Sequence, residues 1–233
     1  IPLWVAAIGS VVAIVVVKQF FGGIGQNFVN PALVGRIVLM ASFPTMMSTW
    51  VQPFAWRGVQ VVTTASPLAS ISSMFTAGDV SAAATASNPA LPSLWQMLIG
   101  QRQGSLGEVC ALALLLGFAY LLIRRVITPV IPLTYIGTVA VIMLIAGKGS
   151  LSFVAYEILG GGLLLGAIFM ATDYTTSPIN FKGKLIYGVG CGILTALIRL
   201  FGSLPEGVSF SIIIMNILAV SYTHLTLPTN SLV

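Results

Sequence analysis

The sequence predicts an all-α polytopic membrane protein, and three observations support that prediction. Hydrophobic residues make up 57% of the 233 residues, charged residues only 6%, and the mean hydropathy is +1.03. Several apolar runs are long enough to cross a bilayer of about 30 Å. The net charge of +5 is interpreted as loop charge that sets orientation in the membrane. We therefore expect membrane lipid, and no nucleic acid, around this chain.

Seven apolar segments are expected to be spanning helices. They are residues 2–21, 31–47, 108–123, 129–147, 151–171, 185–201 and 208–220. Residues 48–107, between the second and third segments, are rich in Ser, Thr, Ala and Pro and should lie outside the hydrocarbon. The sequence thus predicts one transmembrane domain over residues 1–220 with a polar loop at residues 48–107.

Two glycine-rich stretches interrupt the apolar pattern. Residues 21–35 read FGGIGQNFVNPALVG, and residues 159–180 read LGGGLLLGAIFMATDYTTSPIN. Paired interruptions of this kind indicate discontinuous helices with a site between them. Close helix packing through small residues explains the same glycines without a site, and the residues alone leave both interpretations open.

Basic residues predict the orientation of the spans. Arg124 and Arg125 follow the third segment, and Lys182 and Lys184 follow the fifth. Both connections should share one side, and the positive-inside rule makes that side cytoplasmic. The loop at residues 48–107 should then lie on the outer face.

Ionisable residues in or beside spans are costly and often functional. Glu108, Glu157, Asp173 and Arg199 have such positions. Glu157 is the most deeply placed carboxylate and is a candidate for an ion pathway, although a span-end carboxylate that reaches interfacial water is the alternative. Asp173, followed by several hydroxyl residues, is interpreted as a polar turn or as part of a cofactor lining. No Ser has a paired base, so no hydrolytic site is expected.

Four separated blocks carry a resemblance to a known family. KQFFGGIGQNFVNPALVGRI, GSLGEVCALALLLG, FMATDYTTSPIN and GSLPEGVSFSIIIMN occur in this order within residues 1–220. Together they resemble the D subunit of the Rnf ion-translocating electron-transport complexes. The B subunit of the related sodium-translocating NADH:quinone reductase is similar and is the alternative within the family.

The resemblance implies both a fold and a role. The fold would be a urea-channel-like helical bundle with inverted repeats. The complex would lie in a bacterial or archaeal plasma membrane, pass electrons between ferredoxin and NAD, and move sodium ions or protons outward. The implied partners are the other Rnf membrane subunits, an outer flavin-bearing subunit and a flavin transferase.

The resemblance also implies a covalent flavin. The family motif is roughly Asp-x-x-Thr/Ser-x-Ala-Thr-Pro-Leu, and its last Thr carries FMN through a phosphoester. In VQVVTTASPLAS, residues 59–70, that position is Ser66, with Thr63, Thr64 and Pro67 beside it. Ser replaces the usual Thr, and Gln60 replaces the usual Asp. A second, non-covalent flavin is compatible with the same family.

The residues themselves are compatible with this assignment. A residue before proline favours extended conformations, so Pro67 should hold the Ser66 hydroxyl in a strand-like loop that a modifying enzyme can reach. A plain Ser/Thr-rich turn is the alternative. If Gln60 abolishes modification, the chain would be a structural anchor for other flavin subunits. A channel or transporter for a small polar solute is the remaining alternative, but it leaves the hydroxyl-rich motif without a role.

Both ends of the chain are expected to be those of a fragment. The sequence starts without Met, and SYTHLTLPT near its end resembles a translated sequencing adapter. Residues 221–233 are therefore predicted to be a non-native tail. His224 lies in that tail and is assigned no function.

Overall fold

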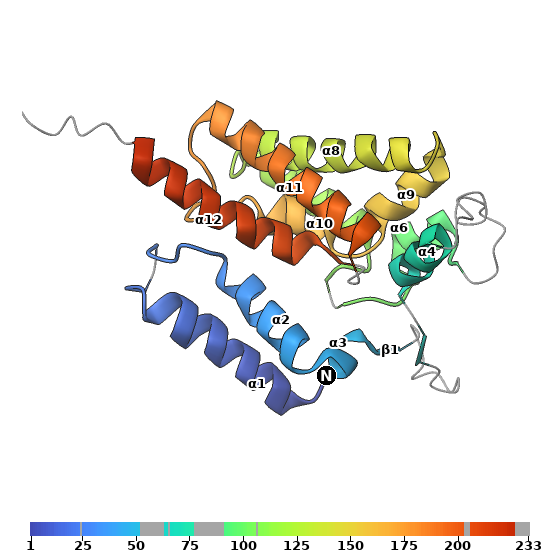
Figure 1. Ribbon diagram of the computed structural model, residues 1–233, viewed down its shortest axis with the longest axis horizontal. Coiled ribbons are helices and arrows are strands. Elements are labelled where there is room, and N and C mark those ends of the chain that lie inside the picture. Colours follow the sequence, from blue (N-terminus) through green and yellow to red (C-terminus); the bar gives the residue numbers. More distant parts are fainter. Residues whose placement is uncertain are drawn as a thin grey trace, which may run out of the picture.

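A computed structural model describes residues 1–23, 25–51, 63–64, 66–76, 91–105, 107–202 and 206–226. The described chain is a bundle of apolar helices that run along one long direction, with their connections gathered at its two ends (Figure 1). The predicted all-α architecture is confirmed. The predicted inverted repeats and the likeness to urea channels stay predictions.

The N-terminal part is a pair of closely packed helices. Helix α1 (Leu3–Val11) continues into a π-helical stretch, η1 (Val12–Gln19), and α2 (Pro31–Ser42) returns beside it, followed by the short α3 (Pro44–Ser48). Asn30 caps α2, because its side-chain oxygen accepts hydrogen bonds from two backbone amides of the first turn. A methyl group added to Gly35 would lie 2.8 Å from the carbonyl oxygen of Gly9. At Gly35, close helix packing is therefore the interpretation that the structure supports.

The polar loop contains short elements rather than a span. Strands β1 (Trp50–Val51) and β2 (Thr63–Thr64) form a two-residue antiparallel ladder. Helices α4 (Pro67–Thr76) and α6 (Leu94–Ile99) follow, and α6 begins with a capping box formed by Ser93 and Gln96.

Three long helices contribute to the main core: α8 (Val130–Ala146), α11 (Phe181–Phe201) and α12 (Val208–Thr226). Helix α7 (Ala111–Ile123) packs in a second, smaller core, where Ala111 and Leu114 are buried with Ile168 of η3. Helix α11 packs tightly on α8 through glycine. A methyl group added to Gly192 would lie 2.6 Å from the Thr138 Cβ, and one added to Gly188 would overlap Thr134. Small residues let the two backbones approach closely, and Tyr135 and Val139 of α8 are fully buried.

The expected fifth span is a broken helix. Helix α9 (Leu151–Leu159) ends before three glycines, and α10 (Leu163–Leu165) runs on into the π-helical η3 (Gly166–Met170). The two halves are bent by 65°. A break predicted from LGGGLLL is thus present at Gly160 to Gly162, whereas the other glycine-rich stretch connects two separate helices.

Each predicted span contains a helix, but the helices differ in length. Among the described residues, α11 is long and apolar enough to cross a membrane, and the bent pair is a second candidate. Shorter apolar helices are Leu3–Gln19, Pro31–Ser42, Ala111–Ile123, Val130–Ala146 and Val208–Ala219. Helix α12 continues past residue 220 to Thr226. Residues 227–233 lie outside the described residues, and the predicted non-native tail stays a prediction.

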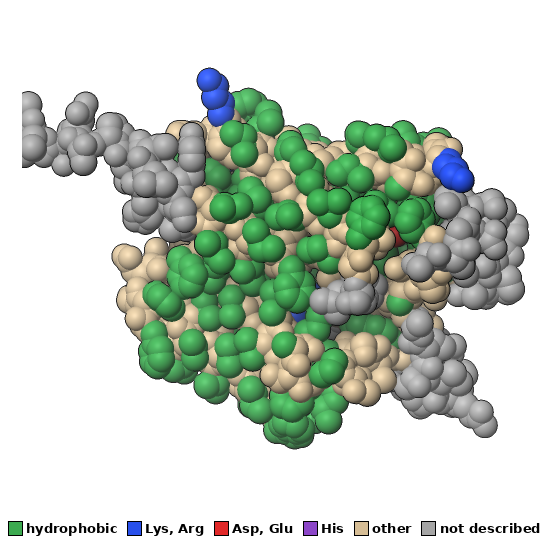
Figure 2. All heavy atoms as spheres, in the orientation of Figure 1, with side chains coloured by type: hydrophobic (Ala, Val, Ile, Leu, Met, Phe, Trp, Pro, Cys, Tyr) green, Lys and Arg blue, Asp and Glu red, His purple; other side chains and the backbone are tan. Residues whose placement is uncertain are grey.

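The two basic connections lie at the same end of the molecule, as the sequence predicts. Tyr174 donates a hydrogen bond to the carbonyl oxygen of Val126, and the Lys184 ammonium donates one to the Thr128 hydroxyl at 3.2 Å. Figure 2 shows hydrophobic side chains across the face between the two ends of the bundle. Among the exposed apolar side chains of the described residues are Leu116 and Leu133, at 64% and 60% exposure, and an apolar helix surface fits a lipid environment.

Candidate functional site

Ser66 lies at the N-terminus of helix α4. Its hydroxyl oxygen accepts a hydrogen bond from the Ala69 backbone amide at 3.2 Å, and its carbonyl oxygen accepts one from the Ser70 amide at 3.1 Å. Pro67 is the first helical residue, where a missing N–H leaves nothing unsatisfied. A helix therefore begins directly after Ser66, whereas Ser66 itself lies outside it, and the predicted extended conformation of Ser66 stays a prediction. The side chain of Ser66 is half-buried.

Helix α4 is anchored on the broken helix. Leu68 is 2% exposed and Ile71 is fully buried. A methyl group added to Gly161 would lie 2.9 Å from the Leu68 Cδ2 atom. Gly161 also has a φ of +59°, a left-handed conformation that favours glycine. The position of Ser66 is thus set, through Leu68, by the glycine break between α9 and α10.

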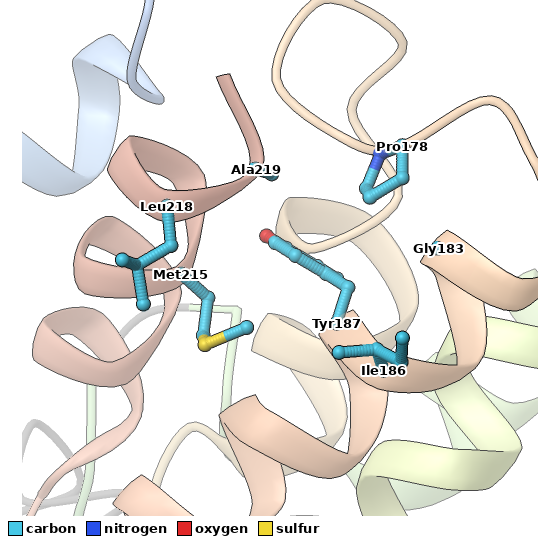
Figure 3. Close-up of a pocket in the computed structure, with 7 residues that line it drawn as sticks. All are labelled: Pro178, Gly183, Ile186, Tyr187, Met215, Leu218 and Ala219. Carbon is cyan, nitrogen blue, oxygen red and sulfur yellow. The ribbon is translucent and has the colours of Figure 1, made fainter. Parts of the chain in front are cut away.

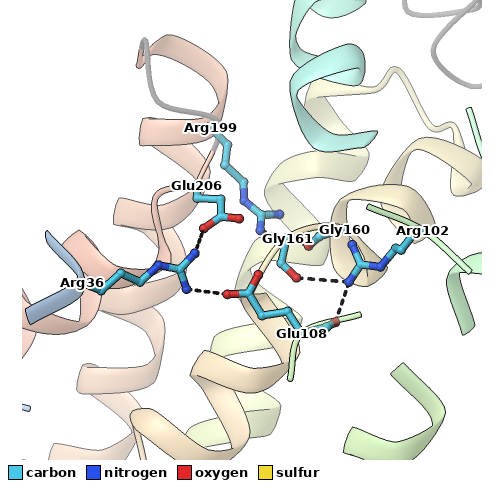
Figure 4. A network of polar contacts seen from close by, with 7 residues as sticks. All are labelled: Arg36, Arg102, Glu108, Gly160, Gly161, Arg199 and Glu206. Atoms are coloured by element: carbon cyan, nitrogen blue, oxygen red, sulfur yellow. Dashed lines mark hydrogen bonds and ion pairs between the residues drawn. The ribbon is translucent and has the colours of Figure 1, made fainter. Parts of the chain in front are cut away.

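Two arginines bind the carbonyl groups that the break leaves free. The Arg199 guanidinium donates to the Glu157 carbonyl oxygen at 2.6 Å and to the Gly160 carbonyl oxygen at 3.4 Å. The Arg102 guanidinium donates to the Gly161 carbonyl oxygen at 3.4 Å (Figure 4). The last carbonyls of a helix have no partner within it, so these arginines satisfy the end of α9. Their positive charge also suits a helix C-terminus.

Carboxylates balance this positive charge. Glu157 pairs with Arg199 at 3.0 Å, and both side chains are nearly inaccessible to solvent. Arg36 of α2 pairs with both Glu108 and Glu206 (Figure 4). The Glu108 carboxylate lies against Gly162, where a methyl group would be 3.0 Å from its Oε1 atom. It therefore places negative charge at the N-terminus of the second half-helix, where such charge is favoured.

Three arginines and three glutamates form one cluster that is formally neutral. We call it the ionic cluster, and its members are Arg36, Arg102, Glu108, Glu157, Arg199 and Glu206. Its members come from α2, α9, α11 and the connections beside them. Outside the helices, burial raises the pKa of Glu206, with the Glu108 charge adding to the shift and arginines opposing it. Burial likewise lowers the pKa of Arg102, although Glu108 opposes that shift. Among the described residues, the Nε atom of Arg199 is buried without a hydrogen-bond partner.

Comparison with known proteins gives this geometry a context. The profile of the NQR2, RnfD, RnfE family matches residues 1–231. The chain belongs to this family. It is 45% identical to the D subunit of the Na(+)-translocating ferredoxin:NAD(+) oxidoreductase complex of Acetobacterium woodii, over 93% of the chain and 63% of the relative.

Other relatives agree on the type of subunit. Identity is 41% to the D subunit of the proton-translocating ferredoxin:NAD(+) oxidoreductase complex of Clostridium ljungdahlii, over 93% of the chain and 65% of the relative. It is 38% to the D subunit of an ion-translocating oxidoreductase complex of Stutzerimonas stutzeri, over 93% and 67% respectively. The chain therefore spans about two thirds of the length of these relatives, and the predicted resemblance to the D subunit of Rnf complexes is confirmed.

In this member of the NQR2, RnfD, RnfE family, the residues that the sequence predicts for the functional site do not all lie together. Ser66 and Pro67 begin α4, which packs on the glycine break after α9, the helix that contains Glu157. Asp173 lies in the connection from η3 to α11, and α11 begins at the end of the bundle opposite α4 (Figure 1). Asp173 accepts hydrogen bonds from the hydroxyls of Thr175 and Thr176 at 2.9 and 3.4 Å. It is thus a turn residue, and it does not lie beside Ser66.

Sequence reasoning missed half of the ionic cluster. In the sequence, Arg36 is a charged residue within the apolar run PALVGRIVLM. Glu206 is the carboxylate of the block GSLPEGVSF. Arg102 lies in the segment predicted to be a polar loop, residues 48–107, and no role was predicted for it. The signal in each case was an ionisable residue in or next to a predicted span, but only the fold shows that the three converge on one glycine break.

Proposed function

We propose that this chain is the D subunit of an ion-translocating ferredoxin:NAD oxidoreductase complex and carries FMN bound covalently to Ser66. The family and the names of its relatives support the first part of the proposal. The observation that carries the second part is the placement of the Ser66 hydroxyl at the N-terminus of α4.

A phosphoester fits this position. Helix N-termini favour anions, because unpaired amide groups point outward and the helix dipole is positive there. The Ala69 amide already donates to the Ser66 hydroxyl oxygen, and the same donor would face a phosphate attached to that atom. Half-burial keeps the hydroxyl within reach of a flavin transferase. Ser66 would be the attachment point, between β2 (Thr63–Thr64), which precedes it in the sequence, and Pro67, which follows it.

The protein would supply position, and the cofactor would supply redox chemistry. When bound, FMN accepts and passes on electrons at its isoalloxazine ring. Leu68 and Ile71 fix α4 on the bundle, and the ionic cluster holds the glycine break on which Leu68 rests. A second, non-covalent flavin remains part of the proposal, with Asp173 as a candidate lining residue at the other end of the bundle.

The proposed location is a bacterial or archaeal plasma membrane with α4 on the outer face. The positive-inside rule supports it, because α8 and α11 begin at the end of the bundle opposite α4 (Figure 1). Arg124 lies in the connection that leads to α8, and Lys182 and Lys184 lie in the first turn of α11. Exposed apolar helix faces would contact lipid and the other Rnf membrane subunits, and an outer flavin-bearing subunit would approach the end that carries α4. Glu157 would belong to the ion pathway of the complex.

A channel for a small polar solute has less support. One pocket is lined by Pro178, Gly183, Ile186, Tyr187, Met215, Leu218 and Ala219, so its walls are mainly apolar. Apolar walls do not replace the hydrogen bonds that a polar solute loses on leaving water.

In-gel fluorescence of the denatured full-length protein, co-expressed with a flavin transferase, tests the flavin assignment. We expect Ser66→Ala to reduce the covalent label to background, because it removes the acceptor oxygen. Thr63→Ala and Thr64→Ala should retain label. Ser66→Thr should keep or raise it, and Gln60→Asp, outside the described residues, should raise it if the missing carboxylate matters.

Ser73→Ala is the matched control. Ser73 is an exposed residue of the same helix, and its hydroxyl donates to the Ser70 carbonyl oxygen at 2.8 Å. It should leave the label unchanged. Full fluorescence in Ser66→Ala would show that the flavin is attached elsewhere and would refute the assignment. A wild-type chain without label would support the structural-anchor alternative instead.

A further inference from the structure

Three hydroxyl groups meet in the fully buried core between α8, α11 and α12. The Tyr135 hydroxyl oxygen lies 2.6 Å from that of Thr195 and 2.9 Å from that of Ser211, and the last two are 2.7 Å apart. All three residues are 0% exposed. We call Tyr135, Thr195 and Ser211 the hydroxyl triad.

The triad has more hydrogen-bond contacts than protons. Besides the contacts among the three oxygens, the Ser211 hydroxyl lies 2.9 Å from the Val208 carbonyl oxygen. Each hydroxyl has one proton to donate and can accept from its neighbours. Either the three hydroxyls form a closed ring, or Ser211 donates to Val208 and the ring is open. Hydroxyls that can exchange donor and acceptor roles without moving their oxygens are suited to passing on a proton.

The triad is also part of a longer polar stripe on α11. Tyr187, Cys191, Thr195 and Arg199 follow each other at four-residue spacing, and all are buried. This spacing places them on one face of the helix, about 6 Å apart, so the stripe extends over about 18 Å. Helix α11 is the described helix that is long enough to span a membrane. Hydroxyl groups between such helices form hydrogen bonds that hold the helices together, and ionisable groups within them mark ion and proton pathways.

Each end of the stripe reaches a different environment. At one end, Arg199 pairs with Glu157 in the ionic cluster. At the other, the Tyr187 hydroxyl lies 2.5 Å from the side-chain amide of Asn216. The Tyr187 ring lines a pocket of about 280 Å³ between α11 and α12 (Figure 3). The stripe therefore runs from the Tyr187–Asn216 hydrogen bond to the Glu157–Arg199 pair of the ionic cluster.

We propose that the hydroxyl triad is a proton relay on a path along α11, from the hydrogen-bonded Tyr187 and Asn216 side chains to the Glu157–Arg199 pair. Each triad oxygen would accept one proton and release its own to the next oxygen, so no other bond changes and the triad ends with its original number of protons. Neighbouring positions of the stripe are about 6 Å apart along the helix axis, and water or side-chain rotation would bridge the steps on either side of the triad. The proposal rests on the proposed membership of an ion-translocating complex, but not on the flavin at Ser66.

The test uses the complete complex in sealed vesicles. Proton transport and electron transfer are measured on the same preparation. Electron transfer is measured a second time with a protonophore, which removes the proton gradient that opposes it. We expect Tyr135→Phe and Thr195→Val to lower protons moved per electron at least tenfold, while electron transfer with protonophore stays within twofold. Thr195→Ser, which keeps the hydroxyl, should restore transport.

Two matched controls separate a relay from general packing. Tyr156→Phe removes another buried tyrosine hydroxyl, which donates to the Pro92 carbonyl oxygen away from the stripe. Thr134→Val removes a hydroxyl on the same helix as Tyr135 that bonds only to carbonyls of its own helix among the described residues. Both controls should leave protons moved per electron unchanged.

Several outcomes would overturn the relay. The first is an unchanged ratio in Tyr135→Phe, with or without a lower yield of complex, because the hydroxyls would then serve packing only. The second is a wild-type complex that moves sodium and no protons, as shown by radioactive sodium uptake. Covalent flavin fluorescence of the same samples reports separately on Ser66, so failure of that assignment would be recognised as a different result.

Discussion

The two buried polar regions of this molecule differ in charge, and the difference follows the state of the backbone. Around Gly160 to Gly162 the helix is broken, its carbonyl groups are free, and charged side chains gather. Between α8, α11 and α12 the helices are intact, and the hydroxyl triad is neutral. Free carbonyls require strong donors such as arginine, and buried arginines in turn require carboxylates. Intact helices satisfy their own backbone, so uncharged groups suffice.

The largest expected effect comes from Arg199→Met. The substitution leaves the Glu157 charge unpaired and removes the donor to the Glu157 and Gly160 carbonyl oxygens. Breaking a buried pair in this way costs about 3–5 kcal/mol. Tyr135→Phe should cost only about 1 kcal/mol, because Thr195 and Ser211 remain hydrogen-bonded to each other. Denaturant titration of the purified full-length protein in detergent compares the free energies of unfolding.

A second change sharpens this prediction. Adding Glu157→Gln to Arg199→Met removes the unpaired charge and should recover part of the lost stability. Equal losses for Arg199→Met and Tyr135→Phe would contradict the distinction between the charged and neutral regions.

A smaller effect is expected at the glycine break itself. Gly161→Ala forces a side chain into a left-handed conformation, at a cost of about 1–2 kcal/mol, and its methyl group would press on Leu68. Because Leu68 positions α4, covalent flavin at Ser66 should also fall. Gly137→Ala on α8 is the control, since the added methyl group meets no atom within 4 Å. It should be neutral or stabilising by about 1 kcal/mol. If the Gly161→Ala protein is destabilised but still carries the normal amount of covalent flavin, the glycine break does not position Ser66 for labelling.

The smallest effect is expected from Asp173→Asn. Asp173 lies in the turn between η3 and α11, and the Asn side chain retains an oxygen that can accept from Thr175. The stability change should be within about 0.5 kcal/mol, and covalent label at Ser66 should be unchanged. Loss of a separate, extractable flavin from this variant would instead identify Asp173 as part of a second flavin site.

Sequence alone was sufficient for the helical class, for the approximate extent of the apolar segments and for the family. These properties depend on local composition and on short motifs, which remain visible without a fold. The glycine break in LGGGLLL was predictable for the same reason, and so was the common side of the two basic connections. Helix α4 was missed because the hydroxyl-rich stretch was interpreted as part of a polar loop, whereas Ser followed by Pro is also a favourable helix start.

Only the tertiary structure decided which polar residues act together. Arg36 pairs with Glu108, 72 positions away along the chain, and with Glu206, 170 positions away. No local pattern in the sequence predicts such pairs. The hydroxyls of Tyr135, Thr195 and Ser211 appear in the sequence as isolated polar residues in apolar helices. Their convergence depends on the rotation of each helix about its axis and on the close approach of α8 and α11 that Gly188 and Gly192 permit. Helix rotation and helix separation are set by packing between segments distant in sequence, and for that reason the sequence determined the elements of this protein while the fold determined its sites.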